Sequence, residues 1–226
     1  MTGRNGKLVV LEGAEGVGKT TQIRRLSEAL AGRGIRHLSV REPGGTAIGD
    51  EIRRLLLEPG REISARTEAL LFMASRAELL ERDIGPALED GQVVIADRFF
   101  LSTYAYQIAG RGLAEGDVTA ANRFATGGLV PDLTILLRLP VDVALARTDG
   151  RGARDRIESA ADEFHHRVAS AFDSFADAEW QRRHPEAGPV VAIDAAGTED
   201  QVAAAVLSLL EQTWPETFRP EIGSHP

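Results

Sequence analysis

The chain has 226 residues, 43% of them hydrophobic, which is enough for one large domain with a substantial buried core. Its 34 acidic residues outnumber 26 basic ones, so the net charge of −8 favours neither nucleic acid nor an anionic membrane as a partner. The absence of cysteine excludes disulfides and thiolate metal sites, and without a signal peptide or a run of about 18 apolar residues we expect a cytoplasmic protein.

Short apolar runs rich in Val, Ile and Leu alternate along the chain with segments of helical spacing. The runs cover residues 7–12, 37–41, 92–97, 133–139 and 190–194. The helical segments include residues 19–31, 48–57, 65–80, 162–183 and 199–212. This alternation predicts an α/β fold with a buried parallel sheet and crossover helices, as a single domain over residues 1–214. Residues 215–226 contain three prolines and little apolar material, which predicts a frayed C-terminal tail.

The sequence GAEGVGKT lies between the first predicted strand and the first predicted helix. It matches the phosphate-binding pattern G-x-x-x-x-G-K-[ST] in the strand-loop-helix context that this pattern requires. Glycines let successive N–H groups point at an anion, and the helix N-terminus adds partial positive charge. We therefore expect Lys19 to reach the β and γ phosphates of a nucleotide and the Thr20 hydroxyl to bind Mg²⁺. The loop that would hold ATP comprises Gly13, Ala14, Glu15, Gly16, Val17, Gly18, Lys19 and Thr20.

A second polar element follows the apolar run 92–97, where the sequence reads DR. The carboxylate of Asp97, at the carboxyl end of a strand beside the phosphate loop, is a second candidate ligand for Mg²⁺. The guanidinium of Arg98 can grip a phosphate bidentately. Because Lys19 already serves the donor nucleotide, Arg98 indicates a second phosphate in the same site.

Four motifs together give the chain a resemblance to a known family. GAEGVGKT, REPGGT at 41–46, DRFFLSTYAYQ at 97–107 and DRIE at 155–158, in this order and spacing, are similar to those of thymidylate kinases. The resemblance runs from about residue 7 to residue 212. It implies the P-loop NTPase fold with a five-stranded sheet, phosphorylation of dTMP to dTDP with ATP and Mg²⁺, and a homodimer.

The resemblance also assigns an acceptor site. Glu12 would accept a hydrogen bond from the sugar 3′-hydroxyl, Arg98 and Arg53 would hold the acceptor phosphate, and Tyr106 would stand where a ribose 2′-hydroxyl projects. Phe72 would stack on thymine and Arg76 would donate to a base carbonyl. Residues four apart share a helix face, which suits this pair. The base edge would be lined by Thr103 and Gln107.

An arginine cluster lies in a predicted lid over residues 148–160, where two glycines favour a mobile loop. Charge on the transferring phosphoryl group needs cations beyond Lys19, and the variable positions of the phosphate loop hold no arginine. The resemblance is to the branch of the family whose arginines lie in the lid. It makes Arg156 the catalytic arginine and Arg147 the residue that packs against adenine, and the further ATP-binding candidates are Arg151 and Arg154.

Two alternatives stay open at this point. The chain could phosphorylate another nucleoside monophosphate, which the Phe72, Arg76 and Tyr106 site would distinguish. It could instead be a nucleotide-dependent regulatory NTPase. Neither of its two asparagines begins an Asn-Lys-x-Asp motif, which speaks against a guanine-nucleotide switch.

Overall fold

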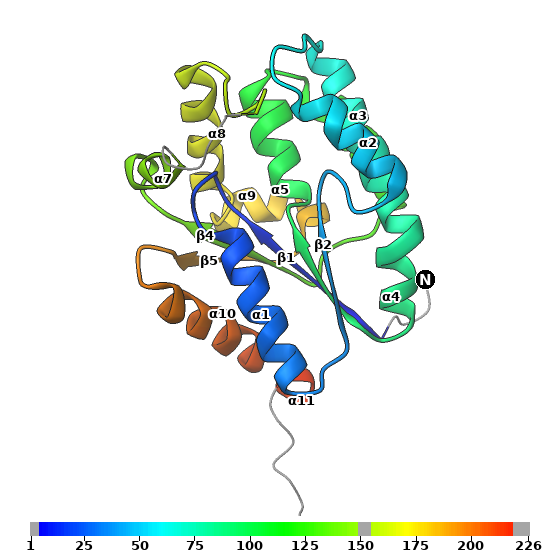
Figure 1. Cartoon of the computed structure of the whole chain (residues 1–226), viewed down its shortest axis with the longest axis vertical. Coiled ribbons are helices and arrows are strands. Elements are labelled where there is room, and N and C mark those ends of the chain that lie inside the picture. The colour runs from blue at the N-terminus through cyan, green and yellow to red at the C-terminus, as the bar shows by residue number, and fades with distance from the viewer. Residues whose placement is uncertain (1–4, 149–154, 219–226) are drawn as a thin grey trace, which may run out of the picture.

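A sheet of five parallel strands organises the molecule, in the order β2-β3-β1-β4-β5. The computed structural model describes residues 5–148 and 155–218. The strands are β1 (Lys7–Glu12), β2 (His37–Arg41), β3 (Val93–Asp97), β4 (Leu133–Arg138) and β5 (Val190–Asp194). The predicted parallel sheet is confirmed, and β1 lies at its centre. Because the strands are parallel, the loop after β1 and the residues after β3 meet at the same edge (Figure 1).

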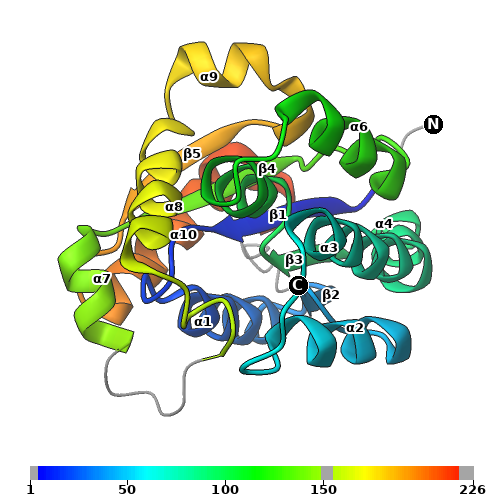
Figure 2. The same cartoon turned by 90° about the horizontal axis from the view of Figure 1, so that it is seen from above.

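Side chains of β1 alternate between two cores, one on each face of the sheet. Val9 and Leu11 pack with α1 and α10, while Leu8 and Val10 pack with the helices of the opposite face (Figure 2). On the first face lie α1 (Lys19–Gly32), α10 (Glu199–Thr213) and α11 (Pro215–Phe218). The second core includes residues of α3 (Ala65–Leu79), η1 (Leu80–Ile84), α4 (Gly85–Glu89), α5 (Phe100–Thr103), η2 (Tyr104–Gly110) and α8 (Asp162–Ser174).

The remaining helices are α2 (Ala47–Leu57), α6 (Glu115–Thr126), α7 (Val141–Thr148), α9 (Ala178–Arg183) and the short η3 (Pro185–Ala187). The segments η1 and η2 are π-helical continuations of α3 and α5. In the described ranges, no helix combines the length and the apolar character needed to cross a bilayer.

The single helix expected over residues 162–183 is wrong, because the chain turns between α8 and α9. This turn lets Phe175 become buried and pack against Tyr104 and Trp180, with ring centroids 6.4 and 4.6 Å away. Packing of aromatic rings therefore decides the break, which helical spacing alone did not indicate.

The frayed tail expected from residue 215 begins too early. Residues 215–218 form α11, and Phe218 is fully buried in the core beside α1 and α10. Proline suits the first turn of this helix, because its missing N–H would have no helical partner there. The proline content predicts a frayed tail, whereas Pro215 begins a helix. Residues 219–226 lie outside the described residues.

Candidate active site

The loop between β1 and α1 closes around its own lysine. Lys19 Nζ donates to the carbonyl oxygens of Gly13 (3.0 Å) and Ala14 (2.8 Å). Gly16 has a φ of 77°, and a Cβ there would lie 2.1 Å from the Ala144 carbonyl oxygen, so only glycine fits. Among the described residues no side chain caps the first turn of α1, which leaves its N–H groups free to bind an anion. The loop thus has the geometry of a phosphate site.

The charge of Lys19 is poised to change on ligand binding. Burial, followed by repulsion from Arg98, lowers the pKa of Lys19 from 10.5 to about 7, although Asp97 and Glu12 act in the opposite direction. An anion in the loop would favour the protonated ammonium. Binding of a phosphate is therefore coupled to uptake of a proton at or above neutral pH.

Arg98 stands directly after β3 in a left-handed backbone conformation, with a φ of 74°. A non-glycine residue rarely adopts this conformation, and such strain gathers at functional sites. The Arg98 guanidinium donates to Ser102 Oγ (2.9 Å) and to the Gly13 carbonyl oxygen (3.2 Å). Burial opposes its charge, but Tyr106 and Asp97 raise the pKa of Arg98 above its usual value. A permanent cation therefore lies beside the phosphate loop.

Thr20 and Asp97, the two residues predicted to hold Mg²⁺, lie next to each other. Thr20 Oγ1 lies 3.4 Å from Asp97 Oδ2, and within the described part of the chain Asp97 Oδ1 is buried without a hydrogen-bond partner. A free carboxylate oxygen beside a hydroxyl fits a hard cation such as Mg²⁺. The described residues contain no group of three or more His, Cys, Asp or Glu side chains suited to a metal. Such an ion would therefore rely on phosphate oxygens and water for its remaining ligands.

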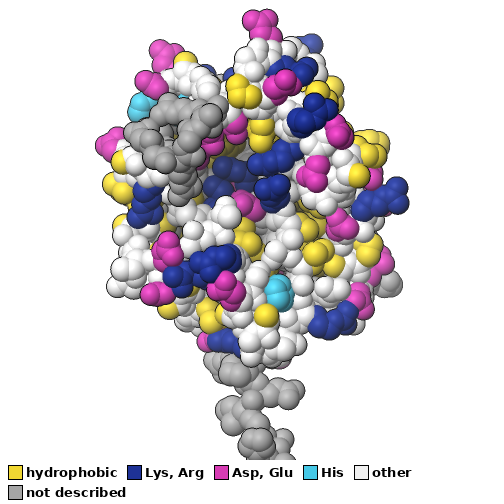
Figure 3. Space-filling model, viewed as in Figure 1, with side chains coloured by type: hydrophobic (Ala, Val, Ile, Leu, Met, Phe, Trp, Pro, Cys, Tyr) yellow, Lys and Arg dark blue, Asp and Glu magenta, His cyan; other side chains and the backbone are white. Residues whose placement is uncertain are grey.

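A cavity of about 320 Å³ joins the phosphate loop to most of the predicted acceptor residues. The predicted residues that line it are Glu15, Gly16, Gly18, Lys19, Thr20, Arg53, Phe72, Arg76, Asp97, Arg98, Thr103, Tyr106 and Gln107. Lys and Arg side chains gather in this hollow on the face shown in Figure 3. The loop residues Gly13, Ala14 and Val17 do not line the cavity. Gly13 and Ala14 supply carbonyls to Lys19, and Val17 is buried in the core.

Glu12, which was expected to meet a sugar hydroxyl, does not line the cavity. The fully buried Glu12 carboxylate accepts hydrogen bonds from Phe99 N (2.7 Å), Ser102 N (3.0 Å) and Ser102 Oγ (2.7 Å). Its oxygens are therefore engaged in holding the start of α5. Glu15 lines the cavity instead, and burial together with a hydrogen bond to Glu158 raises the pKa of Glu15 to about 7.

Arg76 lies in the cavity wall, but its donors are engaged within the protein. Arg76 Nε donates to Glu42 Oε2 (2.7 Å), and its terminal nitrogens donate to Thr103 Oγ1 (2.8 Å), the Phe99 carbonyl oxygen (2.9 Å) and Asn122. The guanidinium is 2% exposed, so it is locked in one orientation. To donate to a bound base, Arg76 would have to share or exchange one of these partners.

Phe72 and Tyr106 face the same space from two different helices. Phe72, on α3, is half-buried and lines the cavity, as a stacking residue must. The Tyr106 ring packs against Phe164 and Phe172 of α8, with centroids 6.1 and 6.3 Å away. The Tyr106 hydroxyl lies 3.4 Å from a terminal nitrogen of Arg98. Aromatic packing thus fixes the position of a hydroxyl next to the cationic group.

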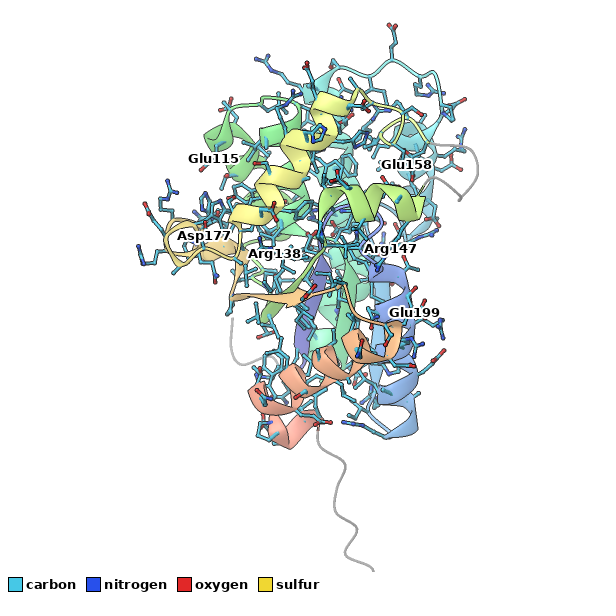
Figure 4. The ribbon with its side chains drawn as sticks, turned by 90° about the vertical axis from the view of Figure 1, so that its left-hand side faces the viewer. Glu115, Arg138, Arg147, Glu158, Asp177 and Glu199 are labelled. Atoms are coloured by element: carbon cyan, nitrogen blue, oxygen red, sulfur yellow. The ribbon has the colours of Figure 1, made fainter. Side chains whose placement is uncertain are left out.

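The two described arginines of the predicted cluster, Arg147 and Arg156, have partners in different parts of the fold. Arg147 extends from α7 and donates to the Ala195 carbonyl oxygen (3.5 Å) in the loop after β5, and both it and Glu158 are labelled in Figure 4. Arg156 does not line the cavity, since its side chain binds Glu68 (2.6 Å) and the Leu56 carbonyl oxygen (2.7 Å). Arg151 and Arg154 lie outside the described residues.

Several lining residues had no individual role in the sequence prediction. The cavity is also lined by Thr21, Arg41, Glu42, Pro43, Leu57, Ser102, Asp155, Ile157 and Glu158. Most of them lie in the REPGGT and DRIE motifs or beside a predicted site residue. These motifs could therefore have indicated that the residues belong to the site. Burial, followed by repulsion from Arg41, lowers the pKa of Arg53, which indicates how closely the cations are placed.

Known proteins match this chain over nearly all of its length. A family model described as thymidylate kinase matches residues 11–186. A thymidylate kinase of Synechococcus sp. (strain JA-2-3B'a(2-13)) is 48% identical over 207 residues, which cover 92% of this chain and 95% of that protein. A thymidylate kinase of Pseudomonas fluorescens is 47% identical, with coverage of 92% and 96%. One of Cutibacterium acnes is 48% identical, with coverage of 78% and 86%.

Proposed function

This chain belongs to the thymidylate kinase family and converts dTMP to dTDP, and we propose that it uses ATP as the phosphoryl donor together with Mg²⁺. One observation carries the proposal: a single cavity holds both the phosphate-loop lysine, Lys19, and the separate cation Arg98, with Phe72 on its wall. Transfer of a phosphoryl group from one nucleotide to another requires a binding group for the phosphate of each, and both groups must face the same space.

On the donor side, Lys19 and the first N–H groups of α1 would bind the β and γ phosphates. Thr20 and Asp97 would hold Mg²⁺, which supplies positive charge to neutralise the phosphate oxygens. We assign Arg147 to adenine, because it reaches the loop after β5 from α7. A role of Arg151 or Arg154 toward the transferring group stays a prediction.

On the acceptor side, Arg98 and Arg53 would bind the phosphate of dTMP, with Phe72 stacked on the base. Thr103, Gln107 and Arg76 would line the base edge, and Tyr106 would crowd a ribose 2′-hydroxyl. We transfer the contact with the 3′-hydroxyl from Glu12 to Glu15, because only the latter lines the cavity. The acceptor phosphate is already ionised, so the chain mainly aligns it for in-line attack without a covalent intermediate.

The homodimer also stays a proposal. It is supported by two large apolar side chains at the surface, Leu70 on α3 (60% exposed) and Phe124 on α6 (91% exposed), since α3 and α6 pack side by side. Sedimentation of the parent and of Phe124→Asp would test it, with dissociation expected in the variant. The cytoplasmic location likewise stays a prediction.

The test of the function compares the two lysines of the chain. Lys19→Met should nearly abolish phosphoryl transfer from Mg-ATP to dTMP in a folded protein, because it removes the charge in the loop. Lys7→Ala is the matched control, since Lys7 lies over the Trp214 ring and away from the cavity. A panel of nucleoside monophosphates run with the parent should give the highest kcat/KM for dTMP. Near-normal turnover by Lys19→Met would remove the proposed donor site.

A further inference from the structure

Three hydrogen bonds connect Arg156 to helices α2 and α3. Its backbone N donates to the Leu57 carbonyl oxygen (3.2 Å), its Nε donates to the Leu56 carbonyl oxygen (2.7 Å), and a terminal nitrogen donates to Glu68 Oε2 (2.6 Å). Leu56 and Leu57 end α2, and Leu57 lines the cavity. The Arg156 side chain is 11% exposed. Its guanidinium therefore lies between the end of α2 and the start of α3, and it does not line the cavity.

Glu68, near the start of α3, is the centre of this arrangement. Its side chain is 1% exposed, and it accepts from Arg111 Nε (3.0 Å), from a terminal nitrogen of Arg111 (2.9 Å) and from Gln107 Nε2 (3.4 Å), in addition to Arg156. Burial opposes its charge, but the bonds from Arg111 and Arg156 hold the pKa of Glu68 below its usual value. Glu68 is thus a buried carboxylate shared by three donor residues.

The position of Glu68 along α3 links it to the acceptor residues. Glu68, Phe72 and Arg76 are spaced four residues apart, so they follow one face of the helix. Gln107, which donates to Glu68, also lines the cavity. The ion pair between Glu68 and Arg156 therefore lies at the end of the row of side chains proposed to bind the base.

The turn that carries Arg156 has internal bonds of its own. Asp155 Oδ1 accepts from Ile157 N (2.8 Å) and Glu158 N (2.9 Å), and Glu158 Oε2 accepts from Asp155 N (2.9 Å). Asp155, Ile157 and Glu158 line the cavity, whereas the Arg156 side chain does not line it and binds Glu68 of α3. Arg156 thus connects turn 155–158 to helices α2 and α3.

We propose that Arg156 is a positioning residue, which with Glu68 holds turn 155–158 in place as one wall of the dTMP-binding cavity. This proposal rests on the assignment of the cavity to dTMP. It replaces the expectation that Arg156 meets the charge of the transferring phosphoryl group. Its consequence is that loss of Arg156 weakens dTMP binding through the displaced wall and leaves the chemical step largely intact.

The experiment separates binding of dTMP from turnover. The dTMP dissociation constant of Arg156→Ala is measured by calorimetry without ATP, beside steady-state kinetics. We expect the Kd and KM for dTMP to rise about tenfold while kcat stays within about threefold, since the wall shifts but the reacting groups remain. Arg156→Lys should recover part of the affinity, because an ammonium can still bind Glu68. The matched control is Arg82→Ala, an exposed arginine paired with Glu78 near the end of α3, which should match the parent.

A double-mutant cycle with Glu68→Gln tests whether the pair acts as a unit. The combined variant should bind dTMP about as weakly as Arg156→Ala alone, because either change releases the turn. Additive losses, or an unchanged Kd in Arg156→Ala, would overturn the proposal. A fall in kcat of about 10³-fold at unchanged dTMP affinity would make Arg156 catalytic. If Glu68→Gln does not fold, the comparison of kcat with Kd in Arg156→Ala decides alone. Failure of the whole function would appear separately, as an inactive parent.

Discussion

Replacing Lys19 with methionine should make the protein inactive and more stable at the same time. Lys19 is 8% exposed, and burial followed by repulsion from Arg98 lowers its pKa from 10.5 to about 7, which corresponds to the free energy lost by holding the charged ammonium in the folded protein. At about 1.4 kcal/mol per pH unit this loss is roughly 5 kcal/mol. The variant also gives up two hydrogen bonds to the carbonyls of Gly13 and Ala14, worth about 1 kcal/mol each. We therefore expect the free energy of unfolding to rise by about 3 kcal/mol at pH 6.5.

The pH dependence of this gain identifies its cause. Between pH 7 and 10.5 the unfolded chain keeps a proton on Lys19 that the folded chain has released, so the stability of the parent rises with pH in this window. Below pH 7 both states are protonated and the difference is constant. Urea unfolding at pH 6.5 and 8.5 should show the advantage of Lys19→Met shrinking by about 2 kcal/mol. An advantage that does not change with pH, or a loss of stability, would refute the reasoning.

Three further outcomes follow from the site. Tyr106→Phe should lower the preference for dTMP over UMP in kcat/KM, because the hydroxyl beside Arg98 is the group expected to crowd a 2′-hydroxyl; an unchanged ratio would place the discrimination elsewhere. Arg147→Ala should weaken ATP binding measured by calorimetry and leave kcat nearly unchanged, since contact with adenine is the same in ground and transition states; a large loss of kcat would contradict this. Glu12→Gln should lower the free energy of unfolding by about 2 kcal/mol, because the amide nitrogen that replaces one carboxylate oxygen cannot accept the hydrogen bond donated there by Phe99 N and Ser102 N or by Ser102 Oγ; normal stability with a raised KM for dTMP would restore the sugar role to Glu12.

The strands and the phosphate loop could be predicted because local sequence determines them. Buried parallel strands appear as continuous apolar runs, and three of the five have the expected bounds, at residues 7–12, 37–41 and 190–194. The backbone conformation and the closeness of a neighbour such as Ala144 require glycine in the loop. The glycine pattern in the sequence therefore predicts the conformation of the loop.

The side-chain partners could not be predicted in the same way, because they depend on contacts distant in sequence. Glu12 is next to the loop in sequence, yet its carboxylate is occupied by N–H groups about 90 residues away. The DRIE motif predicts Arg156 at the transferring phosphate, but nothing in the sequence indicates Glu68, to which its side chain binds in the structure. For a long arginine side chain, position in the sequence fixes the Cα but leaves open which of several acidic neighbours it reaches.

The fully buried ring of Phe218 has a practical consequence for anyone who produces this protein. It is the last anchor of the described chain, eight residues before the end of the sequence. Truncation after residue 218 should retain the packing, whereas truncation before Pro215 would open a hole under α1 and α10 large enough for an aromatic ring. An affinity tag is therefore better attached beyond residue 226 than spliced onto α10.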